Sequence, residues 1–280
     1  MKNLSLGYSP CPNDTFIFYA MVHGIINTPG FHINEVLLDV ETLNQKALRS
    51  ELDLSKISYH AFGNLRNEYC MLRSGGALGK GCGPLLIGAE EYSISEIKNK
   101  RIAIPGRLTT AYLLLQMFDP DFKIGKADIS VMPFNEIIPA IKKGDVDAGL
   151  IIHESRFTYS SYGLKEIIDL GKWWEEETGL LLPLGGIIAK RELGAETINA
   201  IDKIIYLSIE FAFKNRNIVM RYIKEHAQEL SEDVINRHID LYVNKHSLDI
   251  GADGEKAVKE LLLRAENAGI IPRSDVPLFI

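Results

Sequence analysis

The sequence has few cysteines, and none of them lies in a CxxC pair. Cys11, Cys70 and Cys82 are odd in number among 280 residues and widely separated. Such usage is typical of reduced thiols in a cytoplasm rather than of a disulfide framework. The N-terminal stretch MKNLSLGYSP lacks the apolar core of a secretion signal. We therefore expect a cytoplasmic protein.

Long hydrophobic runs and an excess of positive charge are also missing. No window reaches the roughly 18 consecutive apolar residues of a membrane span. The 31 basic and 37 acidic side chains give a net charge of −6, and no basic run is interleaved with aromatic residues. These features argue against nucleic acid or an anionic membrane as the main partner. We predict no nucleic-acid binding and no membrane insertion.

Motifs for several common chemistries are absent as well. The glycine-rich SGGALGKGCGP (74–84) matches neither GxxxxGK[ST] nor GxGxxG at a strand–helix joint. The sequence contains no HExxH and no GxSxG elbow. His226, His238 and His246 fall in a helical, polar region at spacings unlike a zinc motif. We expect no metal site, and we interpret 74–84 as closely packed turns.

Short apolar runs alternate with segments of helical periodicity along most of the chain. The first set predicts strands at 4–9, 33–40, 52–58 and 84–89, and helices at 15–24, 41–50 and 59–72. The second set predicts strands at 101–106, 129–134, 147–154, 164–171 and 183–192, and helices at 109–118 and 135–144. Such alternation indicates right-handed βαβ units and mostly parallel sheets. Beyond Glu192 the apolar periodicity is helical.

Two such sets followed by a helical tail predict an α/β protein with two lobes. We expect residues 93–182 to form a second lobe, inserted into a first lobe made of 1–92 and 183–280. Ligands of such sheets bind beyond the carboxyl ends of the strands, which here would face each other across a cleft. The loops that follow strands are therefore the places to look for chemistry.

The first of these loops is part of SPCPNDTFIFYA (9–20). Its two prolines make a rigid turn, after which Asn13, Asp14 or Thr15 is expected to cap a helix. The helix N-terminus would attract an anionic or carbonyl ligand; a capped turn without a ligand is the alternative. Cys11 has no histidine close in sequence, which favours an inert thiol over a nucleophile.

Two further loops combine hydroxyl groups with backbone donors. In LSKIS, Lys56 and Ser58 alternate along a strand and can share one face, where they would suit a ligand carboxylate. In IPGRLTT, Thr109 or Thr110 caps an apolar helix, which is a favourable seat for a carboxylate or phosphate. The alternatives are a surface lysine with a plain capping serine, and a purely capping threonine.

The fourth loop carries the candidate base. The strand in DAGLIIHES is apolar from Ala148 to Ile152 and ends on His153 and Glu154. Neighbours in a strand point to opposite faces, so we do not expect a simple His–Glu dyad. A partly desolvated histidine at a strand end suits a general base. A hydrogen-bonded structural histidine is the alternative.

These loops carry a family resemblance. The stretches SPCPNDTFIFYA, DVETLN, SGGALG, PGRLTTAY, AGLIIHESRFTY and DLGKWWEEETGLLLPLGG resemble those of the 1,4-dihydroxy-6-naphthoate synthases of the futalosine route to menaquinone. The resemblance spans essentially the whole chain, as far as AQELS (227–231) and SLDIG (247–251).

The resemblance implies a fold, a reaction and a set of site residues. The fold is the two-lobed one of type II periplasmic solute-binding proteins, without a metal or organic cofactor. The reaction converts cyclic dehypoxanthine futalosine, a small-molecule carboxylate, into 1,4-dihydroxy-6-naphthoate and dihydroxyacetone. The family's base falls on His153, and its substrate contacts fall on Lys56, Ile57, Ser58, Thr109 and Thr110.

Other functions of the same fold are the alternatives. The first is a non-catalytic solute-binding protein for a small acid, against which the missing secretion signal counts. A ligand-sensing regulator would need a DNA-binding unit, and a different biosynthetic enzyme, such as one for the thiamin pyrimidine, would need substrate or metal chemistry that we do not find. The sequence leaves the oligomeric state open.

Overall fold

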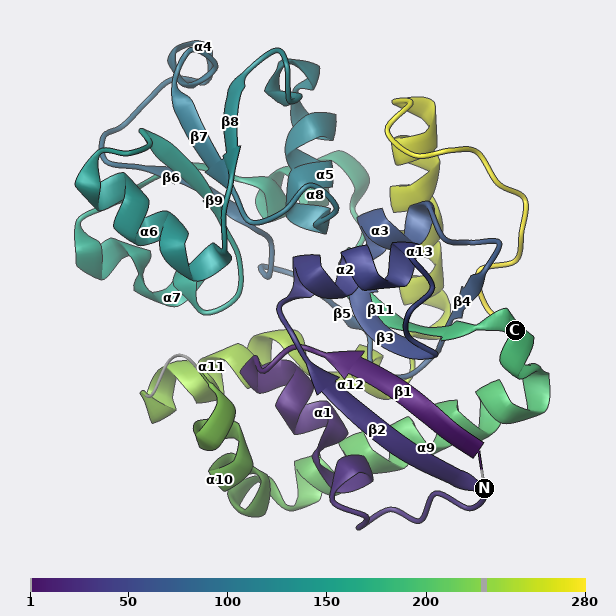
Figure 1. The fold of residues 1–280 in the computed structure, drawn as a ribbon. Coiled ribbons are helices and arrows are strands. Elements are labelled where there is room, and N and C mark those ends of the chain that lie inside the picture. Colours follow the sequence, from purple (N-terminus) through teal and green to yellow (C-terminus); the bar gives the residue numbers. More distant parts are fainter. Residues whose placement is uncertain (1, 228–230) are drawn as a thin grey trace.

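The chain folds into two lobes, each built on its own β-sheet (Figure 1). The structure is a computed structural model that describes residues 2–227 and 231–280. Residues 228–230, in the middle of the AQELS motif, thus lie outside the described part, as does Met1. Among the described helices, none has the length and apolar character needed to cross a lipid bilayer.

The first lobe contains a six-stranded mixed sheet in the order β2-β1-β3-β11-β4, with β5 also paired to β11. Its strands are β1 (Lys2–Tyr8), β2 (Phe31–Leu37), β3 (Leu54–Ser58), β4 (Tyr69–Met71), β5 (Ala77–Gly79) and β11 (Leu182–Lys190). The second lobe contains a five-stranded sheet in the order β10-β6-β9-β7-β8. Its strands are β6 (Leu85–Gly88), β7 (Arg101–Ile104), β8 (Asp128–Val131), β9 (Ala148–Ile151) and β10 (Lys165–Asp169).

Helices cover both faces of each sheet (Figure 1). Those of the first lobe are α1 (Pro12–Val22), α2 (Val40–Leu48), α3 (Tyr59–Gly63), α9 (Ala195–Lys214), α10 (Arg216–His226), α11 (Glu232–Tyr242), α12 (Lys245–Leu248) and α13 (Gly251–Asn267). Those of the second lobe are α4 (Ile94–Ile97), α5 (Thr110–Phe118), α6 (Phe134–Lys143), α7 (Ser155–Thr158) and α8 (Leu170–Thr178). Short 3₁₀ turns occupy Pro120–Phe122, Tyr159–Tyr162 and Arg191–Leu193.

Three apolar clusters fill the space between these layers. One lies under α1, α9, α10 and α11 in the first lobe, and another lies under α6 in the second. The third contains residues of both lobes, among them Ile57 of β3 and Leu113 of α5. In β6, Leu85 and Ile87 face the α6 cluster while Leu86 faces the shared one, as expected for a strand covered on both sides.

The pairing of β6 differs from the predicted lobe boundary. We expected residues 1–92 to belong to the first lobe, but β6 pairs antiparallel with β9 and β10 of the second sheet. The chain therefore passes between the sheets in the segment 80–84 and returns between α8 and β11. A short apolar run such as PLLIGA indicates a buried strand without indicating its partner.

The prediction of mostly parallel sheets is wrong in part. β1 pairs parallel with β2 and β3, and β7 pairs parallel with β8 and β9, as βαβ units require. However, β11 runs antiparallel to β3, β4 and β5. The reason is that β11 enters the first sheet on the return from the second lobe, so its direction is set by that crossover.

The predicted helix over 59–72 is also wrong in its second half. Helix α3 ends at Gly63, and Tyr69–Met71 forms the strand β4. In β4, Met71 aligns with Ile188 of β11. Short apolar runs fit either element, and here a tertiary partner decides the outcome.

The glycine-rich segment 74–84 is closely packed where it enters the second lobe. A methyl group added to Gly83 would overlap Cα and N of Gly171, and one added to Gly171 would lie 2.7 Å from Cα of Gly83. The two backbones can thus touch only because neither residue carries a side chain.

We predict that Gly83→Ala lowers the free energy of unfolding by about 1–3 kcal/mol, because backbone cannot yield as a flexible side chain would. Thermal unfolding followed by circular dichroism measures the effect. Gly79→Ala is the matched control, since an added methyl there meets atoms at 3.5–3.8 Å, an ordinary contact distance. Equal melting temperatures for the two variants would contradict the assignment of a tight backbone contact.

Candidate functional site

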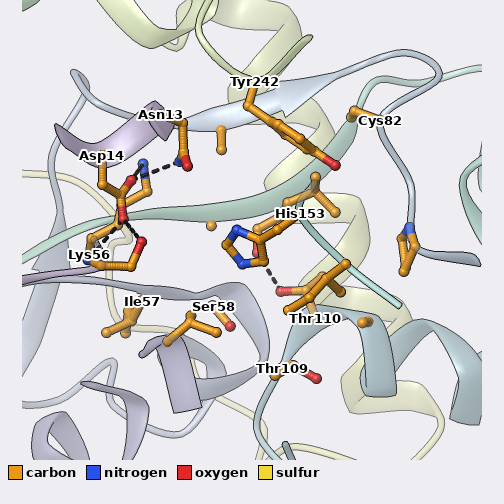
Figure 2. Close-up of a pocket in the computed structure, with 18 of the residues that line it drawn as sticks. Asn13, Asp14, Lys56, Ile57, Ser58, Cys82, Thr109, Thr110, His153 and Tyr242 are labelled. Carbon is orange, nitrogen blue, oxygen red and sulfur yellow. Dashed lines mark hydrogen bonds and ion pairs between the residues drawn. The ribbon is translucent and has the colours of Figure 1, made fainter. Parts of the chain in front are cut away.

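A cavity of about 90 Å³ lies between the lobes (Figure 2). Both lobes contribute side chains to its wall, and all six residues singled out in the sequence belong to it: Lys56, Ile57, Ser58, Thr109, Thr110 and His153. Sites for drug-sized ligands usually measure about 300–1,000 Å³. The structure therefore represents a closed arrangement, and a substrate larger than a few atoms requires the lobes to separate.

The loop after β1 forms one edge of the cavity, to which Asn13 and Asp14 contribute. Neither residue caps the helix as we predicted, because α1 begins at Pro12, with Cys11 at the N-cap position. Proline is favoured at the first helical position, because a backbone N–H there would have no acceptor within the helix and its absence costs nothing. The Asp14 carboxylate instead accepts hydrogen bonds from the backbone N–H (3.1 Å) and hydroxyl (2.7 Å) of Ser9.

Lys56 is buried in the cavity wall with its charge balanced by the protein. Its Nζ atom lies 3.5 Å from Oδ1 of Asp14 and donates to the carbonyl of Gly75. Burial lowers the pKa of the ammonium group, and the neighbouring Asp14 carboxylate opposes that shift. The cation that we expected to meet a ligand carboxylate is thus already paired inside the protein.

Ser58 is connected to the opposite lobe through α2. Its backbone N–H donates to Oδ1 of Asn44 (3.0 Å), and its hydroxyl accepts from Nδ2 of the same residue (3.2 Å). The neighbouring Glu41 accepts from the backbone N–H of Leu108 in the second lobe (3.1 Å). Gly106 makes room for this contact, because a Cβ atom there would lie 2.6 Å from Cδ of Glu41.

The two threonines after β7 have different roles in the structure. Thr109 is the N-cap of α5: its hydroxyl accepts from the N–H of Tyr112 (3.2 Å) and donates to the carbonyl of Gly106 (2.9 Å). The Thr110 hydroxyl of the second lobe donates to the carbonyl of Leu184 on β11 in the first lobe (2.6 Å). Thr109, Thr110 and Ala111, at the N-terminus of α5, all line the cavity, and the first backbone N–H groups of a helix have no partner within the helix.

His153 lies just beyond β9 with a left-handed backbone, φ 56°. Only a few per cent of non-glycine residues adopt this conformation, histidine among the more tolerant. Its ring stacks against Phe134 at 5.1 Å between centroids and against His238 at 5.9 Å. Burial lowers the pKa of His153 to about 4, with Asp14 opposing the shift and Lys56 adding to it. The imidazole is therefore neutral at pH 7.

The expectation that His153 and Glu154 point apart is wrong, because the strand ends at Ile151 and the turn abolishes the alternation. Ligand-type atoms of these two residues and of Cys11 lie within 4.8 Å of one another. Burial raises the pKa of the Cys11 thiol well above its usual value. Metals bind the thiolate, so this group fits a metal ion poorly and we assign none to it.

Two cavity residues, His238 and Tyr242 of α11, were missed in the sequence. His238 was placed in a polar helical region, yet its side chain is fully buried. A signal existed: Ile235, His238, Ile239 and Tyr242 repeat at helical spacing, and all four are buried. A histidine within such an apolar stripe must find partners inside the protein.

The cavity thus combines a neutral imidazole with hydroxyl and backbone donors on its other walls. Figure 2 shows the His153 ring between the Lys56–Asp14 pair on one side and Thr110 on the other. Such a site can hold a polar group with hydrogen bonds while a base accepts a proton in a largely buried space.

Comparison with known proteins gives close relatives over the full length. Residues 4–267 match the protein family described as menaquinone biosynthesis. The 1,4-dihydroxy-6-naphthoate synthase of Thermus thermophilus is 48% identical over 280 residues, 100% of both chains. That of Streptomyces coelicolor is 43% identical over 271 residues, 96% of this chain and 95% of its own.

Solved structures show the same fold. A protein from Archaeoglobus fulgidus superimposes with a TM-score of 0.89 and 36% identity, covering 96% of this chain and 98% of its own. The alkanesulfonate-binding protein of Xanthomonas axonopodis pv. citri, bound to MOPS, gives a TM-score of 0.71 at 12% identity, with coverage of 98% and 95%. The predicted periplasmic-binding-protein-like fold is thus confirmed.

The distant neighbours establish the fold alone, whereas the close relatives establish the family. Identities of 48% and 43% do not arise by chance, and because they extend over nearly the whole length they are not confined to one lobe. The chain therefore belongs to the family of 1,4-dihydroxy-6-naphthoate synthases, enzymes of menaquinone biosynthesis.

Proposed function

We propose that the protein converts cyclic dehypoxanthine futalosine into 1,4-dihydroxy-6-naphthoate and dihydroxyacetone, with His153 as the general base. The observation that carries the proposal is a neutral, stacked imidazole in the cavity that the two predicted contact loops also line. The names of the relatives support the product but do not specify the substrate or the base.

The residues of the cavity match the requirements of the proposed reaction. A proton is taken from a carbon made acidic by a neighbouring carbonyl, a carbon–carbon bond breaks, and the ring system becomes aromatic. A base held in place and shielded from water lowers the barrier for such a sequence. The stacking of the His153 ring against Phe134 and His238 restricts the orientations that the ring can adopt.

We propose the N-terminus of α5 as the seat of the substrate carboxylate, in preference to Lys56. The Lys56 ammonium is already paired with Asp14, so a second carboxylate would share one cation. The first N–H groups of α5, at Thr110 and Ala111, border the cavity and need acceptors there. Lys56, Ile57 and Ser58 would then contact the opposite end of the substrate.

Turnover without an added metal or cofactor and a cytoplasmic location both stay predictions. The distant sulfonate-binding neighbours share only the fold, so a non-catalytic role for small acids is retained as an outcome of the test below.

We predict that His153→Ala reduces turnover at least ~100-fold, the usual contribution of a general base. The assay combines purified protein with cyclic dehypoxanthine futalosine and follows the naphthoate by absorbance and mass. His23→Ala, at an exposed histidine outside the cavity, is the control and should keep wild-type turnover. Tight binding of a small acid without product from the wild-type protein would instead support the solute-binding function.

We predict that kcat/KM falls on the acid side with an apparent pKa near 4, because the base works when neutral and burial lowers the pKa of His153 to about 4. A profile from pH 4 to 8 measures this. An acid limb at or above pH 6.5 would contradict His153 as the base.

Circular dichroism must accompany the assay, since His153 and His60 both have pKa values lowered by burial to about 4. The unfolded chain binds more protons than the folded one between pH 6.5 and 4, so stability declines as the pH falls through that range.

We predict opposite phenotypes for the two adjacent threonines. Thr110→Val should raise KM, because it removes a hydroxyl at the cavity while keeping the side-chain shape. Thr109→Ala should lower the free energy of unfolding by about 1 kcal/mol, the usual cost of a lost N-cap. Steady-state kinetics and thermal unfolding of both variants separate these roles. A Thr110→Val protein that loses stability but keeps its KM would show that this hydroxyl is structural.

A further inference from the structure

Asn44, in the middle of α2, connects the two loops that are predicted to contact the substrate. Its side chain is fully buried. It contacts Ser58 of the first lobe twice: Oδ1 accepts from the Ser58 backbone N–H (3.0 Å), and Nδ2 donates to the Ser58 hydroxyl (3.2 Å). Nδ2 also donates to Oε2 of Glu41 (3.3 Å), and this oxygen accepts from the backbone N–H of Leu108 in the second lobe (3.1 Å).

The Ser58 backbone fixes the orientation of the Asn44 amide. A backbone N–H can only donate, so the oxygen of Asn44 must face it, and the NH₂ group then faces Glu41 and the Ser58 hydroxyl. Both protons of the NH₂ group are thereby used. The Ser58 hydroxyl oxygen is the acceptor in this contact, which leaves its own proton to be donated elsewhere.

The cavity is where the Ser58 proton can find an acceptor. In the part of the chain that the structure describes, the one hydrogen bond of the Ser58 hydroxyl is the one that it accepts from Asn44. Ser58 is 5% exposed and lines the cavity. A buried hydroxyl proton without an acceptor raises the free energy of the protein, and an oxygen atom of a bound ligand removes this cost.

We propose that Asn44 is a positioning residue that makes the Ser58 hydroxyl a hydrogen-bond donor to an oxygen atom of the substrate, and that Glu41 ties this orientation to lobe closure. Asn44 acts through Ser58, and Glu41 acts through Asn44. The proposal deepens the proposed function and rests on it for its kinetic consequences.

Glu41 ties the donor to the second lobe because one oxygen atom serves both lobes. Oε2 accepts from Asn44 on the same helix and from the backbone N–H of Leu108, directly before the N-terminus of α5. The other oxygen, Oε1, accepts from Gln45 (3.1 Å), so both oxygens of the carboxylate are held. Helix α2 belongs to the first lobe and Leu108 follows β7 in the second. Closure therefore completes a chain of hydrogen bonds from the start of α5 to the Ser58 hydroxyl.

The role of the Asn44 amide is tested by Asn44→Asp. This change keeps an acceptor for the Ser58 N–H but replaces the NH₂ donor by an oxygen atom, which accepts the hydroxyl proton and withdraws it from the cavity. It is made together with Glu41→Gln, so that two carboxylates do not face each other. The double variant should have a kcat/KM about five- to tenfold below that of Glu41→Gln alone, mainly through KM, as expected for one lost hydrogen bond.

Ser58→Ala decides whether Asn44 acts through Ser58. In the Glu41→Gln protein, Ser58→Ala should cause the same loss as Asn44→Asp, and the two changes together should cause at most a further loss of about twofold. Losses that multiply would overturn the proposal, because Asn44 would then act independently of Ser58. Asn64→Asp is the matched control: its amide donates to the carbonyl of His60 (3.1 Å) at an exposed position, and kcat/KM should keep the wild-type value.

A second measurement tests the contact between the lobes without turnover. Glu41→Ala removes the acceptor of the Leu108 N–H, whereas Glu41→Gln keeps one. Amide hydrogen exchange at Leu108 should be at least about tenfold faster in Glu41→Ala than in the wild-type protein, and within about threefold of it in Glu41→Gln. Equal exchange rates in the three proteins would overturn the role of Glu41. If the wild-type protein made no naphthoate, the proposed function would fail, while these exchange rates would still decide the contact between Glu41 and Leu108.

Discussion

The buried ion pair between Lys56 and Asp14 is the interaction on which the site depends. Both groups are almost fully enclosed, and each would be costly to bury alone. Asp14 also accepts two hydrogen bonds from Ser9 and one from Asn13. A single carboxylate thereby joins the loop after β1 to the strand β3. Because both oxygens of the Asp14 carboxylate have partners, these contacts fix the position of the carboxylate together with the positions of Ser9, Asn13 and Lys56.

Closure of the lobes depends on contacts made by the same loops that line the cavity. Glu41 accepts from Leu108, Thr110 donates to Leu184, and His60 contacts the carbonyl of Thr109. Thr109, Thr110 and Leu184 of these contacts also line the cavity. A ligand that displaces or orders these groups would therefore change the balance between open and closed arrangements. This coupling suits an enzyme that must exclude water during its reaction.

The fold itself is shared with sulfonate-binding proteins at 12–13% identity, and it specifies no chemistry. What separates this chain from a simple binding protein is the content of the cleft. The cleft contains a histidine with a left-handed backbone whose ring stacks against Phe134 and His238, and holding a small acid requires neither feature. Strained residues persist where surrounding structure imposes them, and they are concentrated at functional sites.

The sequence by itself determined the α/β class, the two-lobed arrangement, most elements and the loops that reach the cavity, because hydrophobic periodicity and Gly-Pro signals are local. Tertiary structure alone decided the partner of β6, the direction of β11 and the change from helix to strand at Tyr69, since strand pairing is a contact between distant segments. It also decided the position of His238. That residue was visible in the sequence, but only folding brings its ring from the first lobe against His153 of the second, in the wall of the cavity.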